Sequence, residues 1–268
     1  MDLESYLFDL VFKSEKNKRD DDNIERDISI IFSFFGLSDN KYPNGQSVGD
    51  EFSVTREYIR QRIQEKVKDV ITDRERLTFK EYIAHVSKKD LYTFNEIKNE
   101  LKKNDLNILT MNAFGFNNFL NTFQIEYPYE IYNFEIKKAN KKDFKILDDF
   151  LIIKKEKIKS IQGLLKQVFT KPGICGLVDL YEIDNINQEI SYEKVKYIIT
   201  QYRSSWTYTE NDRFWYTFEN RDNVIVNNIG KIRSEIKNCE SIKLSEMIYS
   251  SIKARSNKYT IPPKNIIC

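Results

Sequence analysis

The chain has 268 residues and a formal net charge of +2, with 31% charged and 13% aromatic residues. This length corresponds to one or two domains, and the aromatic content indicates packed cores and excludes a disordered chain. No apolar run reaches the roughly 18 residues that a membrane span needs, and Asp2 and Glu4 stand where a secretory signal would be basic. We therefore expect a cytoplasmic protein that does not associate with membranes.

The cysteine and histidine content excludes several catalytic and metal-binding classes. Cys175, Cys239 and Cys268 lie far apart and form no Cys-x-x-Cys motif, which excludes a simple disulfide framework or a zinc ribbon. His85 is the only histidine, which excludes most catalytic triads and histidine-rich metal sites. We expect no metal, no cofactor and no enzymatic activity.

Apolar residues recur at helical spacing along the first half of the chain. Helices are predicted in the segments 2–35 and 55–71, and as short stretches within 77–125. Gly36 fits a C-cap, and Thr55 fits an N-cap. Residues 125–136 alternate between apolar and polar side chains, which predicts a β-strand.

The second half of the chain combines helices with aromatic segments. Helices are predicted at 158–169, 192–202, 224–237 and 243–254, and Pro172 should end the first of them. The aromatic residues around 206 and at 214–218 predict a pair of strands. Two interpretations stay open for Trp206, Tyr208, Trp215 and Tyr216. They fill a small core, which we favour, or they stack on single-stranded bases beside Arg203 and Arg213.

Lysines gather in two runs, which are Lys137, Lys138, Lys141 and Lys142, and then Lys154, Lys155, Lys157 and Lys159. A chain that is nearly neutral overall can still present a basic face, and nucleic-acid binding depends on that face. A solvated surface is the equally weighted alternative. The polar stretch 137–143 is also the best candidate for a linker.

The segment 35–70 carries the most specific pattern in the chain. A short helix at 47–52, a turn at 53–54 and a longer helix from Thr55 predict a helix-turn-helix. Their shared core would be built from Val48, Phe52, Val54, Ile59 and Ile63. Gly49 stands where the two helices must approach closely.

The first two turns of the longer helix present Arg56 and Arg60 together with Glu57 and Gln61, because side chains four apart are neighbours on a helix. Arginine can bond guanine O6 and N7, glutamine can bond adenine, and glutamate can accept from cytosine N4. Recognition helices read bases with their N-terminal residues. The alternative is a surface helix with an ordinary mixture of Glu and Arg.

This segment resembles region four of the primary sigma factors of bacterial RNA polymerase, over about residues 24–71. The matching residues are Phe35-Gly36-Leu37, Val48-Gly49, Phe52, Val54-Thr55-Arg56-Glu57 and Ile59-Arg60-Gln61. Tyr58 and Gly45 depart from the pattern, where arginine and leucine are common. The sigma region that melts the downstream element is not expected here, so the chain should not be a complete sigma factor.

Region four binds the upstream promoter element, so the resemblance implies that double-stranded DNA is the partner, with RNA polymerase or an effector protein as further candidates. The implied DNA-binding residues are Thr55, Arg56, Glu57, Tyr58, Arg60, Gln61, Arg62 and Gln64. Arg62 and Gln64, together with Lys66, would brace phosphates.

Three features of the rest of the chain carry a second resemblance of lower specificity: the segment from Leu164-Leu165 to Gly173-Ile174, the aromatic stretch Arg213-Phe214-Trp215-Tyr216, and the apolar tail before Pro262-Pro263. This part resembles modified helix-turn-helix modules of the kind appended to restriction and chromatin proteins. The alternative for this part is a helical scaffold or an oligomerisation domain. We predict a mostly α fold of tandem helix-turn-helix and winged-helix modules with small β wings. The predicted divisions are 1–75, 76–140 and 141–268.

The predicted function is sequence-specific DNA binding in transcriptional regulation. One alternative is a DNA-targeting or protein-docking adaptor of an effector system such as a phage-defence nuclease. A less favoured alternative is a Mg²⁺-dependent nuclease built on Glu135 and Lys137, with Glu126 or Glu130 as an earlier carboxylate.

Overall fold

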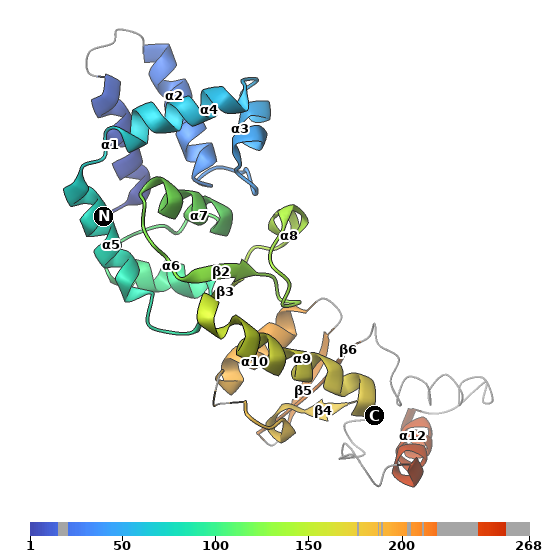
Figure 1. Cartoon of the computed structure of the whole chain (residues 1–268). Helices are drawn as coiled ribbons and strands as arrows, with labels where there is room; N and C mark the ends of the chain where they lie inside the picture. Colours follow the sequence, from blue (N-terminus) through green and yellow to red (C-terminus); the bar gives the residue numbers. More distant parts are fainter. Residues whose placement is uncertain are drawn as a thin grey trace. The chain divides into compact units, whose positions relative to one another are not determined.

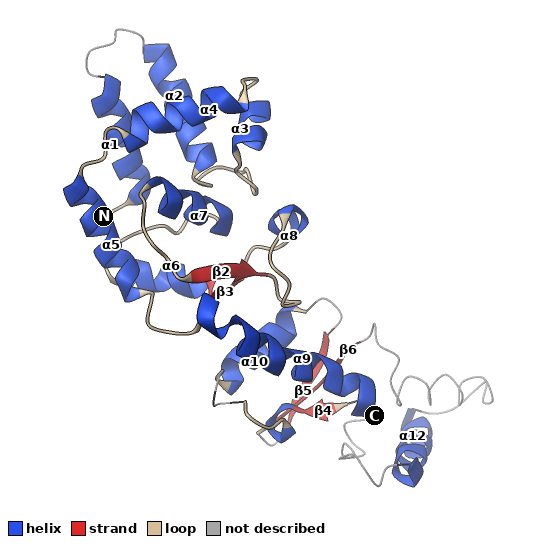
Figure 2. Cartoon of the chain, viewed as in Figure 1, coloured by secondary structure: helices blue, strands red, loops and turns tan. Residues whose placement is uncertain are grey.

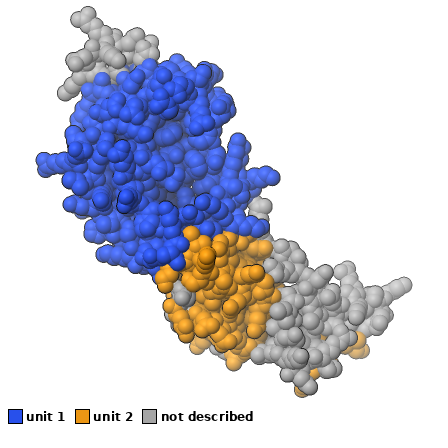
Figure 3. Space-filling view, in the orientation of Figure 1, with its two compact units in different colours: residues 1–133, 137–156 blue, residues 134–136, 157–268 orange. Residues whose placement is uncertain are grey.

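The computed structural model describes residues 1–15, 21–175, 177–186, 188, 190–202, 205–210, 212–218 and 241–255. Within these ranges the protein is mostly helical and carries small antiparallel sheets, which confirms the predicted mostly α class (Figures 1 and 2). The chain forms two compact units (Figure 3). Unit 1 comprises Met1–Asn133 and Lys137–Glu156, and unit 2 comprises Phe134–Ile136 and Lys157–Cys268.

Unit 1 begins with a group of helices. They are α1 (Leu3–Glu15), α2 (Asp21–Phe34), α3 (Gly45–Glu51) and α4 (Arg56–Ile63), which the π-helical turn η1 (Gln64–Lys68) continues. The apolar stripes of α1 and α2 are buried, at Leu3, Leu7, Leu10, Val11, Ile30 and Ile31. Gly36 ends α2 with a φ of 66°, the left-handed conformation expected of a C-cap glycine.

The remainder of unit 1 combines helices with a three-stranded sheet. Its elements are α5 (Asp73–His85), β1 (Leu91–Thr93), α6 (Phe94–Lys103), α7 (Ala113–Thr122), β2 (Tyr129–Tyr132), α8 (Lys141–Ile146) and β3 (Leu151–Lys154). The strand order is β1-β3-β2, with Leu91 opposite Ile153 and Tyr129 opposite Lys154. The chain folds back after Tyr132, where the amide of Asn133 donates to the carbonyl of Lys137. The strand predicted at 125–136 is therefore shorter than expected.

Tilted and edge-to-face aromatic rings join the two halves of unit 1. The rings of Phe119 and Phe123 lie 4.4 Å apart, Phe79 lies 5.0 Å from Phe123, and Phe35 lies 6.5 Å from Phe119. These buried residues lie in or directly after α7, in α5 and directly after α2. One hydrophobic core consequently runs across positions 75/76 and 140/141, where the sequence suggests divisions.

Unit 2 consists of a long helix, a second small sheet and further helices. Its elements are α9 (Ile158–Cys175), β4 (Val178–Asp179), the 3-10 turn η3 (Leu180–Glu182), α10 (Tyr192–Gln201), β5 (Ser205–Glu210), β6 (Arg213–Phe218) and α12 (Ser241–Arg255). The short 3-10 turn η2 (Lys155–Lys157) precedes α9. The strand order is β4-β6-β5. The predicted helix at 224–237 lies outside the described residues.

The helix α9 continues through Pro172 to Cys175, whereas the sequence suggests that it ends near this proline. A proline leaves the carbonyl four residues earlier without its helical donor. That carbonyl belongs to Val168, and it accepts the Tyr216 hydroxyl at 2.8 Å. The tyrosine of β6 thus replaces the missing hydrogen bond.

The two units share an order of elements that the sequence does not reveal. Apart from α8, which lies between β2 and β3, unit 1 runs α5, β1, α6, α7, β2, β3, and unit 2 runs α9, β4, η3, α10, β5, β6. In both, the third strand lies between the first and the second and is antiparallel to each. In the part of the chain that the structure describes, no helix has the length and apolar character needed to cross a membrane.

Replacing Tyr127 by phenylalanine should stabilise unit 1 by about 1 kcal/mol, because its buried hydroxyl has no hydrogen-bond partner. Burial also raises the pKa of Tyr127 well above the ordinary value of tyrosine. A raised pKa contributes stability that is present below pH ~10 and is lost as the pH rises further. The variant should therefore lose less stability above this pH, which urea unfolding followed by circular dichroism would measure.

The neighbouring Tyr129 provides a matched control, since its ring stacks on that of Tyr127 at 4.6 Å. Its hydroxyl donates to the Lys89 carbonyl at 2.6 Å, so Tyr129→Phe should lower the stability instead. Equal effects of the two substitutions would contradict the prediction.

Candidate nucleic-acid interface

The helices α3 and α4 are defined by their capping residues. The Asn44 side chain accepts hydrogen bonds from the amides of Gln46 and Ser47, which starts α3 at Gly45 and not at the predicted residue 47. Thr55 caps α4 as predicted, because its hydroxyl oxygen accepts the amide of Tyr58 at 3.1 Å. Both caps satisfy amides that would otherwise lack partners at a helix start.

The turn between these helices depends on Gly49. A Cβ at this position would lie 2.7 Å from the carbonyl oxygen of Val54, closer than real Cβ contacts allow. The amide of Val54 donates to the Gly49 carbonyl at 2.8 Å, and Ser53 adopts a φ of 55°. This confirms the expected close approach at Gly49, and it fixes α4 against α3.

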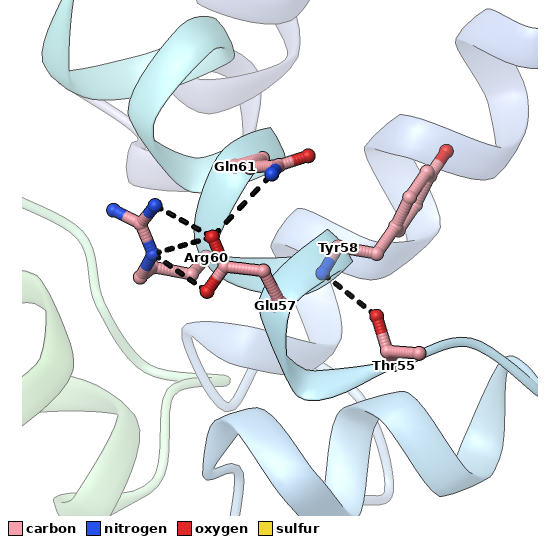
Figure 4. A network of polar contacts seen from close by, with 5 residues as sticks. All are labelled: Thr55, Glu57, Tyr58, Arg60 and Gln61. Atoms are coloured by element: carbon pink, nitrogen blue, oxygen red, sulfur yellow. Dashed lines mark hydrogen bonds and ion pairs between the residues drawn. The ribbon is translucent and has the colours of Figure 1, made fainter.

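Glu57 organises the exposed face of α4 (Figure 4). It accepts three hydrogen bonds from Arg60, at 3.0 Å from Nε to Oε1, at 2.9 Å from Nε to Oε2 and at 2.6 Å from Nη2 to Oε1. Gln61 Nε2 lies 3.4 Å from the same carboxylate. The hydrogen bond from Arg60 lowers the pKa of the Glu57 carboxyl below its ordinary value. The side chains of Glu57 and Arg60 are 58% and 68% exposed, so solvent screens the pair and a ligand could exchange with it.

Arg56 is exposed and packs over the first residue of α3. A Cβ at Gly45 would come within 3.1 Å of Arg56 Cγ. The glycine that departs from the sigma pattern therefore provides the space in which the arginine stem lies. We expect a larger residue at 45 to shift Arg56.

Three other predicted interface residues are engaged within the protein. Arg62 Nη1 lies 3.6 Å from the buried carboxylate of Asp27, and the Arg62 guanidinium lies 4.7 Å from the centre of the Tyr58 ring. Gln64 donates to Asp69 at 2.6 Å. These contacts anchor the helix to its own surroundings.

Lys66 cannot brace a phosphate, contrary to the expectation from the sequence. Its side chain is only 3% exposed, and its ammonium lies 3.8 Å from Asp27. Desolvation lowers the pKa of this lysine. The π-helical turn at η1 places Lys66 among the buried residues.

A groove of about 590 Å³ lies along α4. Its lining is formed by Phe34, Gly45, Arg56, Glu57, Ile59, Arg60, Ile63, Lys68, Asn118, Asn121 and Thr122. The last three belong to α7 and form the opposite wall. Only tertiary packing brings these polar groups of α7 beside α4, and no spacing in the sequence indicates it.

The candidate nuclease residues do not lie on a strand, because β2 ends at Tyr132 and Glu135 is in the following turn. Glu130, an expected metal ligand, pairs with Lys138 at 3.2 Å. No group of three or more His, Cys, Asp or Glu side chains that could hold a metal ion occurs among the residues that the structure describes.

The aromatic residues of β5 and β6 divide between the core and the surface. Trp215 and Tyr216 are buried, as the core interpretation expects, whereas Trp206 and Tyr208 are 38% and 41% exposed. The two exposed rings stack at 6.1 Å. Arg213 lies 3.6 Å from Asp179 and 3.8 Å from Glu182, and Arg203 lies outside the described residues.

Comparison of the chain with protein-family models, with curated proteins and with solved structures finds no match.

Proposed function

We propose that α3 and α4 form a helix-turn-helix that binds double-stranded DNA, with α4 as the recognition helix. One observation carries this proposal. The first two turns of α4 present Arg56, Glu57, Arg60 and Gln61 to solvent, on a helix that Thr55 caps and Gly49 holds against α3. Exposed side chains at the N-terminal end of such a helix are those that reach base edges in the major groove.

Binding would exchange the contacts around Glu57. Arg60 would leave part of its pairing with Glu57 and donate to guanine O6 and N7, while Gln61 would bond adenine. Glu57 would then be free to accept from cytosine N4. The intrahelical pair holds Arg60 ordered before binding and discourages non-specific attachment to phosphates, because its charge is already compensated.

We further propose that the shared element order of the two units marks two winged-helix modules. The order in which each third strand lies between the first and second supports this. In unit 1 the helix before β2 is α7, and it is occupied by internal packing. Asn118 of α7 donates to the carbonyl of Phe34 at 2.8 Å and also to the carbonyl of Pro43. This leaves α4 as the exposed reading helix of unit 1.

On this basis the protein is a sequence-specific DNA-binding protein that regulates transcription. Its net charge of +2 favours binding through local patches. Unit 2 would extend the footprint, since linked modules raise affinity through effective concentration.

The test is a selection of the full chain against a random duplex library, followed by fluorescence anisotropy at two salt concentrations. We expect one sequence family to be enriched and to bind more tightly than a scrambled duplex at both salt concentrations. If no sequence is enriched and unrelated duplexes bind equally, α4 is not a reader, and the adaptor hypothesis replaces this proposal.

Substituting Glu57 by glutamine should raise the affinity for any duplex and weaken the sequence preference. The change removes a negative charge beside the phosphates and releases Arg60 from its ion pair. One additional phosphate contact should steepen the dependence of log K on log salt by about 0.9. Losing the acceptor for cytosine should cost about 1–3 kcal/mol of discrimination.

Glu65→Gln is the matched control for this experiment. Glu65 is also exposed and pairs with Arg62 at 3.3 Å, but it lies beyond the first two turns of α4. It should change the sequence preference little. Identical behaviour of the two variants would mean that only net charge matters.

A further inference from the structure

Exposed lysines gather on the connection between β2 and β3. We name them the α8 lysine cluster, and its members are Lys137, Lys138, Lys141, Lys142 and Lys145. Lys138 pairs with Glu130 at 3.2 Å. Within the residues that the structure describes, no carboxylate lies at ion-pair distance from Lys141, Lys142 or Lys145. These three ammonium groups are therefore available to an external anion.

The helix α8 is held in a defined position by aromatic packing. Phe144 is buried, and its ring lies 4.4 Å from Phe150, 5.2 Å from Phe114 and 5.6 Å from Tyr42. Asn140 caps the helix, and Asp143 completes the capping box. Because Tyr42 lies just before α3, this packing brings α8 close to the loop that leads into the first helix of the proposed helix-turn-helix (Figure 1).

An open groove of about 860 Å³ separates the lysines from α3. Lys141 and Lys145 stand on one side, and residues of α3 and of the loop before it stand on the other. The carboxylates facing the lysines are those of Asp39, Asp50 and Glu51.

These carboxylates decide where an anion can lie. Glu51 accepts from Ser33 at 2.7 Å and from Asn40 at 3.0 Å, and Asp50 accepts from Gln46 at 2.7 Å. Their negative charge would repel a phosphate from the α3 side. A polyanion is therefore drawn to the exposed lysines of α8 from the side away from these carboxylates.

The geometry points to a second DNA contact: we propose that the α8 lysine cluster binds the phosphate backbone of the duplex that α4 reads. In helix-turn-helix complexes the first helix crosses the backbone while the second enters the major groove. A strand that crosses the start of α3, away from Asp50 and Glu51 at its end, would continue toward α8. Lysine contacts to phosphate fix register without reading sequence. This inference rests on the proposed function of α4 and extends it to a second surface of unit 1.

The test compares the full-length wild type with the triple variant Lys141→Ala/Lys142→Ala/Lys145→Ala. Binding to the selected and to a scrambled duplex is measured by anisotropy across a series of salt concentrations. The variant should bind both duplexes more weakly by the same factor. The slope of log K against log salt should decrease by about 3, while the ratio of the two affinities stays at the wild-type value.

Lys88→Ala/Lys102→Ala/Lys103→Ala is the matched control, since it removes the same charge from exposed positions before β1 and at the end of α6. It should leave the salt slope close to that of the wild type. The inference is overturned if both triple variants change the slope equally, or if the α8 variant binds as the wild type does. Absence of any duplex binding by the wild type also overturns it.

The two proposals fail in distinguishable ways. If the wild type shows no sequence preference but the α8 variant still loses salt-dependent binding, the reading role of α4 fails and the phosphate contact stands. If the wild type keeps its preference and the α8 variant is unaffected, only the phosphate contact fails. Circular dichroism of each variant checks that it is folded.

Discussion

Replacing Gly115 by alanine should destabilise unit 1 by about 3 kcal/mol or more. A Cβ at this position in α7 would lie 2.0 Å from the carbonyl oxygen of Phe35 and 2.7 Å from Cα of Gly36. These are backbone atoms and cannot rotate away, so α7 must shift from the end of α2. Overpacking of this kind typically costs about 1–3 kcal/mol, and the shift would also separate Phe119 and Phe123 from Phe35.

Urea unfolding followed by far-UV circular dichroism would measure the loss. Both tryptophans, Trp206 and Trp215, belong to unit 2, so their fluorescence gives a separate reading of that unit. Gly163→Ala in α9 is the matched control. Nothing lies within 4 Å of its Cβ position, so the substitution should stabilise the helix by up to about 1 kcal/mol. A Gly115→Ala variant as stable as the wild type would contradict this packing of α7.

The double variant Arg56→Ala/Arg60→Ala should lose about 2–6 kcal/mol of preference for the selected duplex over a scrambled one. Each bidentate arginine–guanine contact contributes about 1–3 kcal/mol of discrimination, and the two sites are one helical turn apart. Both side chains are exposed, so their removal should leave the fold intact. Anisotropy with both duplexes, at the two salt concentrations used for the wild type, measures the ratio.

Arg74→Ala/Lys80→Ala controls for the loss of two positive charges. Both residues are exposed on α5, away from the turn between α3 and α4. This variant should keep the wild-type preference and lose at most a small, sequence-independent part of the affinity. If the Arg56 and Arg60 variant also keeps the preference, α4 does not read bases, whatever its resemblance to a recognition helix.

Much of the interface is predictable from local sequence. Thr55 can be identified as a cap because a threonine before a charged first turn accepts hydrogen bonds from the free amides of a helix start. The role of Gly49 can be identified because a glycine is needed where a short helix turns tightly onto the next one. The exposure of Arg56, Glu57, Arg60 and Gln61 follows from the burial of Ile59 and Ile63 on the opposite face. These are effects within one or two helical turns, and periodicity reports them directly.

Lys66 and Arg62 show where this reasoning fails. Helical spacing places Lys66 near the polar face, yet η1 is a π-helical turn with a different periodicity. In addition, the Asp27 carboxylate of α2 draws the side chains of Arg62 and Lys66 inward. The sequence of a helix does not reveal which carboxylate of a distant segment will contact it. The same holds for the wall that α7 contributes to the groove beside α4.

The sequence by itself determined the mostly helical class, the Thr55 cap of α4, the turn between α3 and α4, and the basic composition of the segment around α8. Each depends on residues within a few positions of one another. The tertiary structure alone decided that a single core joins the first helices to the β1-β3-β2 sheet, that α7 is packed inward, and that α8 lies beside α3. These features arise from contacts between segments that are distant in the sequence. Such contacts depend on complementary shape and on burial, and they produce no periodic pattern in the sequence.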